Sequence, residues 1–305
     1  MFTPNLLTAN DKAGTYPASY YAATANTTAP FETIEGDQSC DIVVIGGGFT
    51  GLSSALHLAE RGFDVILLEA HRVGWGASGR NGGQVGSGQR REQDDLEKMV
   101  GRDDAKKLWD IAEQSKDIVK SLITKHDIKC DWKPGILHAD HRARFVSDTH
   151  AYTEKLQSEY GYNQIRNVDR AEMREMLGTE FYHGGSLDMG AGHIHPLNFV
   201  LGIANAARAA GARIFENAMV TSYENQSGKV TVKTSNGAVV SANKVILGCN
   251  GYLDALEDRV AKRVMPINNF IIATEPLSDD LARDLIRDDV AVADSKFVIN
   301  YYRLS

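Results

Sequence analysis

Residues 41–70 read DIVVIGGGFTGLSSALHLAERGFDVILLEA, and the order of residue types in this stretch decides the fold. The apolar run 41–45 predicts a buried strand, and a glycine-rich turn follows it directly. Apolar residues then recur at i, i+3, i+4 and i+7, which predicts an amphipathic helix that ends before Gly62. A second apolar strand, 64–68, is followed by the carboxylate of Glu69. The stretch therefore predicts a strand–helix–strand unit of the kind that binds an adenine dinucleotide.

The three glycines of the turn have separate roles. Gly46, Gly48 and Gly51 have the spacing G-x-G-x-x-G. The first allows a tight turn, the second lets the main chain approach a pyrophosphate, and the third lets the helix pack closely on the strand. We expect Phe49 and Thr50 to open the helix, where free N–H groups and the positive end of the dipole favour phosphate. A lone glycine motif is also compatible with a turn that binds no ligand. Here, however, the two strands, the helix and the acid occur in the order and at the spacing that dinucleotide binding requires.

Glu69 and its neighbour Ala70 follow the glycines by roughly 20 residues, where a carboxylate accepts hydrogen bonds from a ribose. A 2′-phosphate is disfavoured there, because it would face a like charge. The motif alone does not distinguish NAD from FAD.

Residues 72–84, RVGWGASGRNGGQ, come almost immediately after the second strand. In an NAD dehydrogenase the sheet would normally continue through another crossover helix. A long glycine-rich polar segment instead indicates main chain that lies along an extended cofactor. A flexible polar loop is the alternative, because glycine and serine are also typical loop residues.

Together these motifs resemble the FAD-dependent oxidoreductases of the D-amino-acid oxidase, glycine oxidase and sarcosine oxidase superfamily, and within it the gamma-glutamylputrescine oxidase group. The resemblance covers nearly the whole chain. It rests on the runs at 43–62, 74–84, 192–216 and 271–277 and on the lead-in SYYAATAN at 19–26.

The resemblance implies FAD as the cofactor and an α/β fold. It implies a FAD-binding Rossmann-like domain of the ββα type with a second, mainly antiparallel-sheet substrate lobe. The main chain near Met219 and Val220 is expected to meet the adenine. Spacing alone indicates only a strand-ending turn in LGCNGYL, residues 247–253. The residues that the resemblance places near the pyrophosphate and the flavin ring are Ser78, Arg80, Asn81, Gly82, Gly83, Gln84, Gly248, Asn250 and Gly251.

The pattern along the chain predicts three parts. They are an N-terminal arm (1–40), a FAD-binding domain (41–90 and 212–255) and a substrate lobe (91–211 and 256–305). Predicted helices span 103–126, 148–160 and the run from Pro196 to a closing Gly211. Predicted strands are 131–139, 185–195, a hairpin over 229–247 with Asn236 and Gly237 at its tip, a buried strand at 244–247, and strands within 264–277 and 297–304.

The length and composition agree with a soluble enzyme that has a large core. The chain has 305 residues, of which 43% are hydrophobic, and a net charge of −7 that argues against nucleic-acid binding. No apolar run approaches the roughly 20 residues that cross a bilayer, and no signal peptide is evident, so we expect a cytoplasmic location. The three cysteines, Cys40, Cys130 and Cys249, lack metal-site spacing and are expected to be reduced.

The substrate lobe offers candidate cleft residues but no identifiable acid or base. The candidates are His193, His195, Tyr301 and Tyr302. The two histidines alternate and would share one face of a strand, as metal ligands do. No carboxylate or cysteine pattern completes such a site, so we expect packing residues and no metal. A serine hydrolase is not supported either, because no G-x-S-x-G elbow occurs.

The resemblance implies oxidation of an amine such as gamma-glutamylputrescine, as in polyamine catabolism, with oxygen as the acceptor. The imine would hydrolyse to an aldehyde, with ammonia and hydrogen peroxide as the other products. One alternative is a flavin oxidase or dehydrogenase for glycine, sarcosine or a D-amino acid. Another is an inactive dinucleotide-binding fragment, because the resembled family continues past Ser305 with a glycine-containing segment and a helix, so that we expect a C-terminally truncated chain. The sequence has no coiled-coil heptad, and it does not show the oligomeric state.

Overall fold

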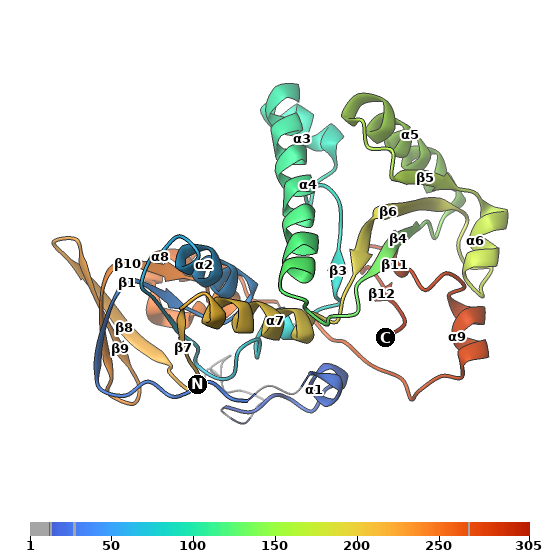
Figure 1. Ribbon diagram of the computed structural model, residues 1–305. Helices are drawn as coiled ribbons and strands as arrows, with labels where there is room; N and C mark the ends of the chain where they lie inside the picture. The colour runs from blue at the N-terminus through green and yellow to red at the C-terminus, as the bar shows by residue number, and fades with distance from the viewer. Residues whose placement is uncertain (1–11, 13, 27–28, 268) are drawn as a thin grey trace, which may run out of the picture. The chain divides into compact units, whose positions relative to one another are not determined.

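The computed structural model describes residues 12, 14–26, 29–267 and 269–305 (Figure 1). The chain divides into two compact units. The first contains the chain up to Asn81, Lys125–Cys130 and Pro196–Ile271; the second contains Gly82–Thr124, Asp131–His195 and Ile272–Ser305.

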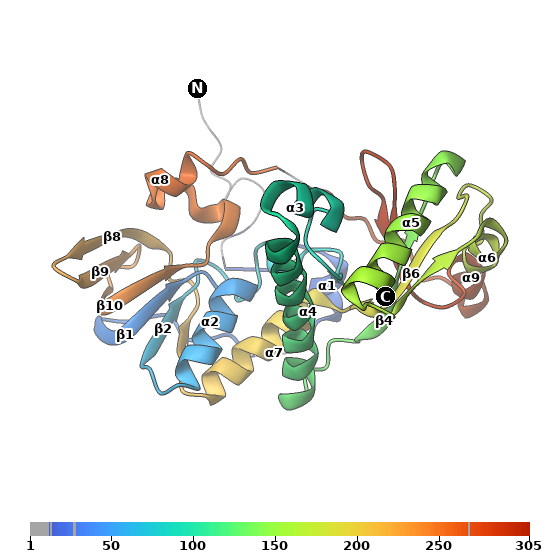
Figure 2. The same ribbon diagram turned by 90° about the horizontal axis from the view of Figure 1, so that it is seen from above.

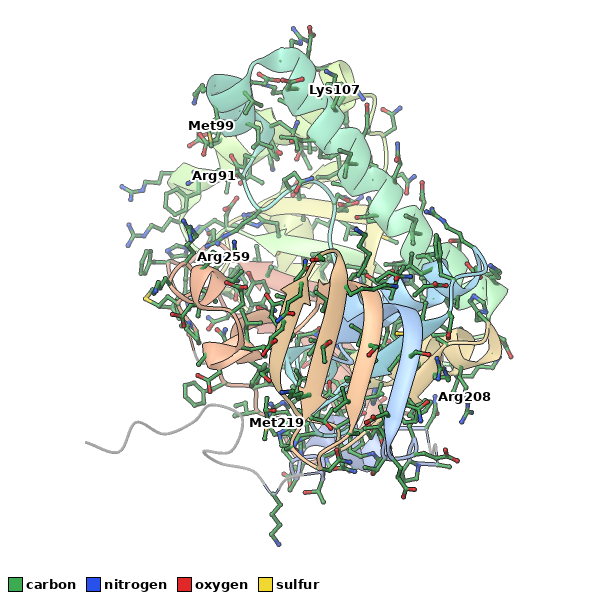
Figure 3. The ribbon with its side chains drawn as sticks, turned by 90° about the vertical axis from the view of Figure 1, so that its left-hand side faces the viewer. Arg91, Met99, Lys107, Arg208, Met219 and Arg259 are labelled. Atoms are coloured by element: carbon green, nitrogen blue, oxygen red, sulfur yellow. The ribbon has the colours of Figure 1, made fainter. Side chains whose placement is uncertain are left out.

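The first unit is built on a six-stranded sheet with the order β7-β2-β1-β10-β9-β8. Strand β1 pairs in parallel with both β2 and β10, and β2 pairs in parallel with β7. Strands β10, β9 and β8 continue as an antiparallel meander, seen beside β1 in Figure 3, where Met219 directly precedes β8. The elements of this unit are α1 (Tyr20–Thr24), β1 (Asp37–Ile45), α2 (Phe49–Ala59), β2 (Val65–Leu68), η1 (Ala77–Gly79), α7 (Pro196–Ala209), β7 (Arg213–Phe215), β8 (Val220–Gln226), β9 (Lys229–Thr234), β10 (Val239–Leu247), η2 (Asn250–Leu256) and α8 (Asp258–Ala261).

Alternation along the strands separates two packed faces of this sheet. One face carries a core cluster of small and β-branched residues, to which Ile34 of the arm contributes. On the other face, α2 packs against β1 and β2, and α7 lies beside α2 (Figure 2). Strand β2 is buried throughout, as expected for a parallel strand covered on both faces.

The second unit contains a mainly antiparallel sheet with the order β12-β11-β4-β6-β3, and β5 pairs with β6 outside this path. Its one parallel pair is β11 with β4. The elements of this unit are β3 (Gln84–Val85), α3 (Gln93–Val100), α4 (Arg102–Lys125), β4 (Lys133–Ala139), α5 (Ala143–Tyr160), β5 (Ile165–Val168), α6 (Arg170–Met176), β6 (Gly185–His193), α9 (Asp279–Leu285), β11 (Ala291–Asp294) and β12 (Tyr301–Tyr302). A parallel-rich sheet and a mainly antiparallel sheet in one α/β chain confirm the predicted fold class.

The compact units differ from the predicted division at the arm and in four other stretches: residues 82–90 belong to the second unit, and residues 125–130, 196–211 (with α7) and 256–271 belong to the first. The sequence division placed α7 in the substrate lobe, but its apolar surface packs on α2, and both helices belong to the first unit. Residues 29–36 also join the first unit, and Asp37–Cys40 form the start of β1. Of the SYY aromatics in the arm, Tyr21 is buried, at 8% exposed. Residues 1–11, 13 and 27–28 of the predicted arm lie outside the described residues.

Several predicted elements need correction. Among the described residues of 264–277 there is no strand. The side chains of Met265, Phe270 and Ile272 are more than three quarters exposed. A strand here would therefore lack the packing that stabilises residues of high β-propensity. Of 297–304 only Tyr301–Tyr302 pairs, with β11. Helix α5 begins at Ala143, five residues before the predicted start. Residues 244–247 are the end of β10, with Lys244 exposed and the other three half-buried, and not a separate buried strand.

Candidate functional site

The parallel strands of the first unit end together at one edge of the sheet. Ile45 at the end of β1 is in register with Leu68 of β2 and Leu247 of β10. The next residues continue the pairing, because Gly46 N–H donates to Leu68 O at 2.8 Å and Gly248 N–H donates to Ile45 O at 2.7 Å. In open α/β sheets, ligands bind outside these carboxyl ends.

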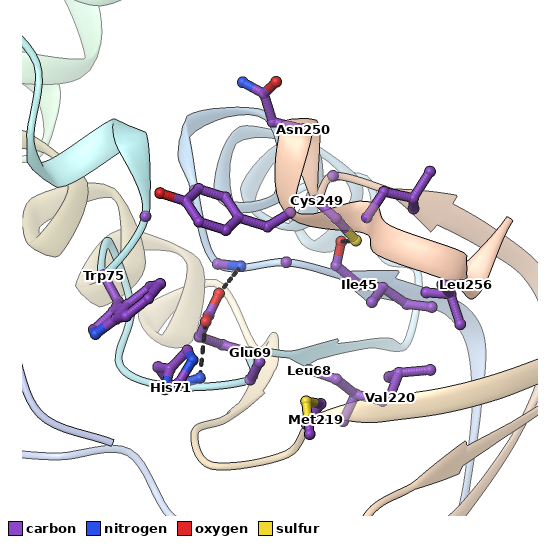
Figure 4. Close-up of a pocket in the computed structure, with 18 of the residues that line it drawn as sticks. Ile45, Leu68, Glu69, His71, Trp75, Met219, Val220, Cys249, Asn250 and Leu256 are labelled. Atoms are coloured by element: carbon purple, nitrogen blue, oxygen red, sulfur yellow. Dashed lines mark hydrogen bonds between the residues drawn. The ribbon is translucent and has the colours of Figure 1, made fainter. Parts of the chain in front are cut away.

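A cavity of about 360 Å³ opens at this edge (Figure 4). Its volume lies within the range of small-molecule sites. All of its lining residues belong to the first unit. They are Ile45–Gly48, Leu68–His71, Trp75–Ser78, Ala218–Thr221, Gly248–Asn250 and Tyr252–Leu256.

Two glycines of the motif allow main-chain contacts that any side chain would prevent. A Cβ on Gly51 would lie 1.9 Å from Gly46 O, so only glycine lets α2 approach β1 this closely. Gly46 has φ +107°, and a Cβ there would lie 2.8 Å from Gly248 O. Both positions therefore require glycine for close main-chain approach.

Gly48 and Ser78 together shape the amino end of α2. Gly48 is the N-cap of this helix and offers no side chain. Instead, Ser78 Oγ accepts the first helical N–H, that of Phe49, at 3.0 Å. A Cβ on Gly48 would lie 2.8 Å from Ser78 Oγ, so glycine at this position lets the Ser78 hydroxyl reach the first helical N–H. Gly46–Gly48 and Ser78 line the cavity, and the positive end of the α2 dipole favours a phosphate group there.

Glu69 is held by main-chain donors at the end of β2. Its Oε2 accepts the N–H of Gly47 at 2.6 Å, and its Oε1 accepts the N–H of His71 at 2.9 Å. These are the dashed lines in Figure 4. Burial raises the pKa of the Glu69 carboxyl, and the two N–H groups oppose that rise. Each oxygen keeps lone-pair capacity, so the carboxylate can still accept from ribose hydroxyls.

Aromatic side chains line the cavity beyond Glu69. The rings of His71 and Trp75 stack with centroids 4.0 Å apart, and Tyr252 meets Trp75 edge-on at 5.8 Å. Arg80 lies over Trp75, 4.7 Å from the ring centroid, and donates to Tyr252 Oη at 3.0 Å. This cluster brings the 72–84 segment and η2 together on one side of the nucleotide cavity.

Met219 and Val220 line the cavity across from Cys249 (Figure 4), and offer main chain and apolar side chains suited to a planar base. The N–H of Ala218 donates to Glu69 O at 2.8 Å, which attaches this segment to the end of β2. The Cys249 thiol donates to Ile45 O at 3.3 Å, and burial raises its pKa to about 11.

The structure gathers part of the predicted cofactor set around the cavity. Gly46, Gly48, Glu69, Ala70, Ser78, Met219, Val220, Gly248 and Asn250 line it. Phe49, Thr50 and Gly51 are in the first turn of α2 but not in the lining, and Arg80, Asn81 and Gly251 also lie outside it. Gly82, Gly83 and Gln84 belong to the second unit.

Sequence reasoning missed the main chain of Gly47 and the side chains of His71, Trp75 and Tyr252. Trp75 lies inside the 72–84 run and Tyr252 inside LGCNGYL, so their aromatic character next to motif glycines was a usable signal. His71 carried no such signal, because nothing in the pattern shows that it stacks on Trp75.

In the second unit, the candidate histidines have protein partners. His193 is fully buried; its Nε2 donates to Asp289 O at 3.1 Å, and Arg303 donates to its Nδ1 at 3.3 Å. This pattern defines the neutral Nε2–H tautomer, and burial lowers the pKa of the ring. Strand β6 ends at His193, so His195 follows the strand; it is buried, and burial lowers its pKa too.

The two candidate tyrosines form the short strand β12. Tyr301 is 58% exposed, and Tyr302 is half-buried, with a pKa raised by burial. Among the described residues, no group of three or more His, Cys, Asp or Glu side chains could hold a metal ion. Within the same residues, no helix combines the length and apolar character that a membrane crossing requires.

The residues present fit the adenine dinucleotide half of FAD. The glycine cradle, the amino end of α2 and the Glu69 carboxylate offer space, N–H donors and a ribose acceptor in one cavity.

Comparisons with known proteins agree with this reading of the site. Residues 41–305 match the protein family described as DAO, FAD dependent oxidoreductase. The chain is 42% identical over 291 residues to the gamma-glutamylputrescine oxidoreductase of Escherichia coli strain K12, covering 95% of this chain and 68% of that protein. It is 40% identical over 291 residues to the probable oxidoreductase OrdL of Haemophilus influenzae, covering 94% of this chain and 67% of that protein.

Among solved structures, glycine oxidase from Geobacillus kaustophilus superposes with a TM-score of 0.61 at 20% identity, covering 73% of this chain and 58% of that one. At this identity the likeness shows the fold alone. The chain thus spans about two thirds of the length of these curated relatives and less of the solved structure.

Proposed function

Because this chain belongs to the family of FAD-dependent oxidoreductases, we propose that it oxidises a primary amine of the gamma-glutamylputrescine type with oxygen as the acceptor. One observation carries the substrate class: the 42% identity to the gamma-glutamylputrescine oxidoreductase of Escherichia coli extends over 95% of the chain. The amine, oxygen and water would give an aldehyde, ammonia and hydrogen peroxide. This reaction would place the protein in the breakdown of polyamine derivatives.

FAD, when bound, supplies the acceptor for the hydride equivalent that leaves the carbon next to the amine nitrogen. The chain's own contribution in the first unit is to hold the nucleotide half. The Glu69 carboxylate would accept from the ribose hydroxyls, and the amino end of α2 would offset phosphate charge.

The second unit supports orientation more than proton transfer. One of its two buried candidate histidines, His193, accepts a hydrogen bond at Nδ1 and donates one from Nε2, as the neutral ring does. Such a residue is not available to take a proton from a substrate amine without breaking a buried contact. We therefore propose that amine oxidation depends on alignment and exclusion of water rather than on His193 as a base.

The test is anaerobic reduction of the FAD-loaded protein by a panel of amines, followed by a peroxide assay in air. We expect bleaching of the flavin absorbance by gamma-glutamylputrescine and release of peroxide in equal amount to the aldehyde. Bleaching only by glycine, sarcosine or a D-amino acid would instead support an amino-acid oxidase. Bleaching that persists in air and turns over only with a dye would support a dehydrogenase. A protein that binds FAD but is bleached by none of these compounds would refute the proposal and support an inactive dinucleotide-binding protein.

A further inference from the structure

Glu216 is a buried carboxylate with no part in the site described above. It directly follows β7 and is 0% exposed. It does not line the nucleotide cavity. A buried carboxylate is costly unless it is paired and hydrogen-bonded, so its partners show what it stabilises.

The partners of Glu216 come from two separate segments of the chain. Its Oε1 accepts the N–H of Val73 at 2.8 Å, and its Oε2 accepts the N–H of Phe31 at 3.1 Å. Arg72 Nε lies 2.7 Å from Oε2 as an ion pair, with the Arg72 side chain only 18% exposed. One carboxylate thus joins the arm, the segment 71–75 and the end of β7.

The segment 71–75 has a direct role at the cavity and is held by the arm as well. It presents the stacked rings of His71 and Trp75 to the cavity (Figure 4). Trp75 Nε1 donates to Thr15 O at 2.8 Å, and Tyr16 Oη donates to Val73 O at 2.7 Å. The segment belongs to no helix or strand, so these contacts substitute for regular pairing.

We propose that Glu216 is a positioning residue for the nucleotide half of FAD. It fixes the main chain of residues 71–75, and through that segment it fixes the Glu69 carboxylate and the His71–Trp75 wall in their binding geometry. The arm is the second support of the same segment, through Tyr16. If the His71 and Trp75 side chains are already ordered before binding, the protein loses less conformational entropy when the ligand binds, and the affinity is higher. The proposal depends on FAD binding by the family and is independent of which amine is oxidised.

The test measures binding of FAD and of ADP, the latter because it occupies only the nucleotide half. For Glu216→Ala we expect both to bind about tenfold to a hundredfold more weakly, by the same factor. Glu216→Gln keeps one acceptor oxygen and is expected to fall between this variant and wild type. Asp64→Asn is the matched control, since it breaks the Arg213 ion pair at the opposite end of β2 and should leave both affinities unchanged.

A local spectroscopic readout separates positioning from general loss of stability. The chain has three tryptophans, so labelling with 5-fluorotryptophan gives three ¹⁹F signals, and Trp75→Phe assigns one of them. We expect Glu216→Ala to shift or broaden the Trp75 signal and to leave the signals of Trp109 and Trp132 in place. Folded Glu216 variants that bind ADP within about threefold of wild type, with the Trp75 signal unmoved, would overturn the proposal.

Tyr16→Phe keeps the test decisive if the Glu216 variants do not fold. It removes only the hydroxyl that donates to Val73 O and keeps the ring beneath Arg72. We expect ADP binding to weaken about twofold to tenfold. Unchanged ADP binding in this variant would then overturn the proposal. Failure of the wild-type chain to bind either ADP or FAD would remove its premise and overturn it as well, whereas failure of every amine to reduce bound FAD would bear only on the proposed substrate.

Discussion

Replacing Glu69 by glutamine tests how the carboxylate at the end of β2 recognises the cofactor. The wild-type carboxylate accepts N–H groups from Gly47 and His71 and has further lone pairs for ribose hydroxyls. A glutamine amide has one acceptor oxygen, and its NH₂ group would face one of the two N–H donors. Hydrogen bonds to a charged group contribute about 1.5–3 kcal/mol, so Glu69→Gln is expected to weaken FAD binding about 10- to 150-fold.

The same substitution should change the stability of the unliganded protein much less. Burial raises the pKa of Glu69, which means that the folded protein carries a desolvation cost for the charged form. Glutamine removes that cost while it loses one charge-assisted hydrogen bond. Because the two effects oppose each other, we expect a net change in the free energy of unfolding within about 1.5 kcal/mol.

The raised pKa of Glu69 also gives a pH dependence whose sign follows from linkage. In the unliganded protein the carboxyl takes up a proton as the pH falls through a folded-state pKa above its ordinary 4.5. This uptake stabilises the unliganded fold relative to neutral pH. Ribose hydroxyls donate to the charged form, so FAD binding releases that proton. Affinity for FAD should therefore fall on acidification, by at most about tenfold per pH unit, and this contribution should be absent in Glu69→Gln.

The assay is titration of the apoprotein with FAD, followed by flavin fluorescence at a series of pH values. Glu60→Gln is the control, because it makes the same chemical change at the C-cap of α2, where Glu60 pairs with Lys125. It should bind FAD as wild type does. The reasoning would be refuted by a Glu69→Gln protein that binds within threefold of wild type at neutral pH, or that keeps the full pH dependence.

Three further predictions concern the main chain and the thiol at the cavity. Gly51→Ala should prevent stable folding of the first unit, because its Cβ would lie 1.9 Å from Gly46 O; a cooperative wild-type melting curve would contradict this. Gly48→Ala should fold, since its φ of −91° suits alanine, but should weaken FAD binding at least tenfold because the methyl group displaces Ser78 Oγ from the amino end of α2; calorimetric titration with FAD checks this. Cys249, with a pKa near 11, should react slowly with a thiol reagent at neutral pH and more slowly still with FAD bound; rapid labelling of the folded protein would contradict its burial.

The parts of the fold that the sequence predicted are those encoded locally. The strand, glycine turn, helix and acid of residues 41–70 follow one another directly in the sequence, so their order and spacing could be compared with the known motif. Hydrophobic periodicity likewise predicted α4, and the proline and glycine at its two ends predicted α7, each to within about two residues at each end. Residues 264–277 show the opposite case, since β-branched composition predicted a strand that has no pairing partner among the described residues.

The candidate site was only partly predictable, because half of it depends on register between distant segments. Gly248 meets Gly46 only because β10 pairs with β1 in parallel, across about 200 residues of chain. The family resemblance placed Gly248 near the pyrophosphate, whereas the spacing of residues alone indicated only a turn. Glu216 carried no sequence signal at all, since its partners Val73 and Phe31 donate through main-chain N–H groups that any residue except proline would offer.

We expect recognition of the nucleotide and choice of substrate to be separable in this chain. Every residue that lines the nucleotide cavity belongs to the first unit, and so do Glu216 and the described part of the arm that supports the 71–75 segment. The candidate cleft residues His193, His195, Tyr301 and Tyr302 all belong to the second. Substitutions at Glu69 or Glu216 should therefore change ADP and FAD affinity in parallel, while substitutions of the second-unit candidates should change amine turnover and leave ADP affinity untouched. A Tyr302→Phe protein with weakened ADP binding would show that the two functions are coupled after all.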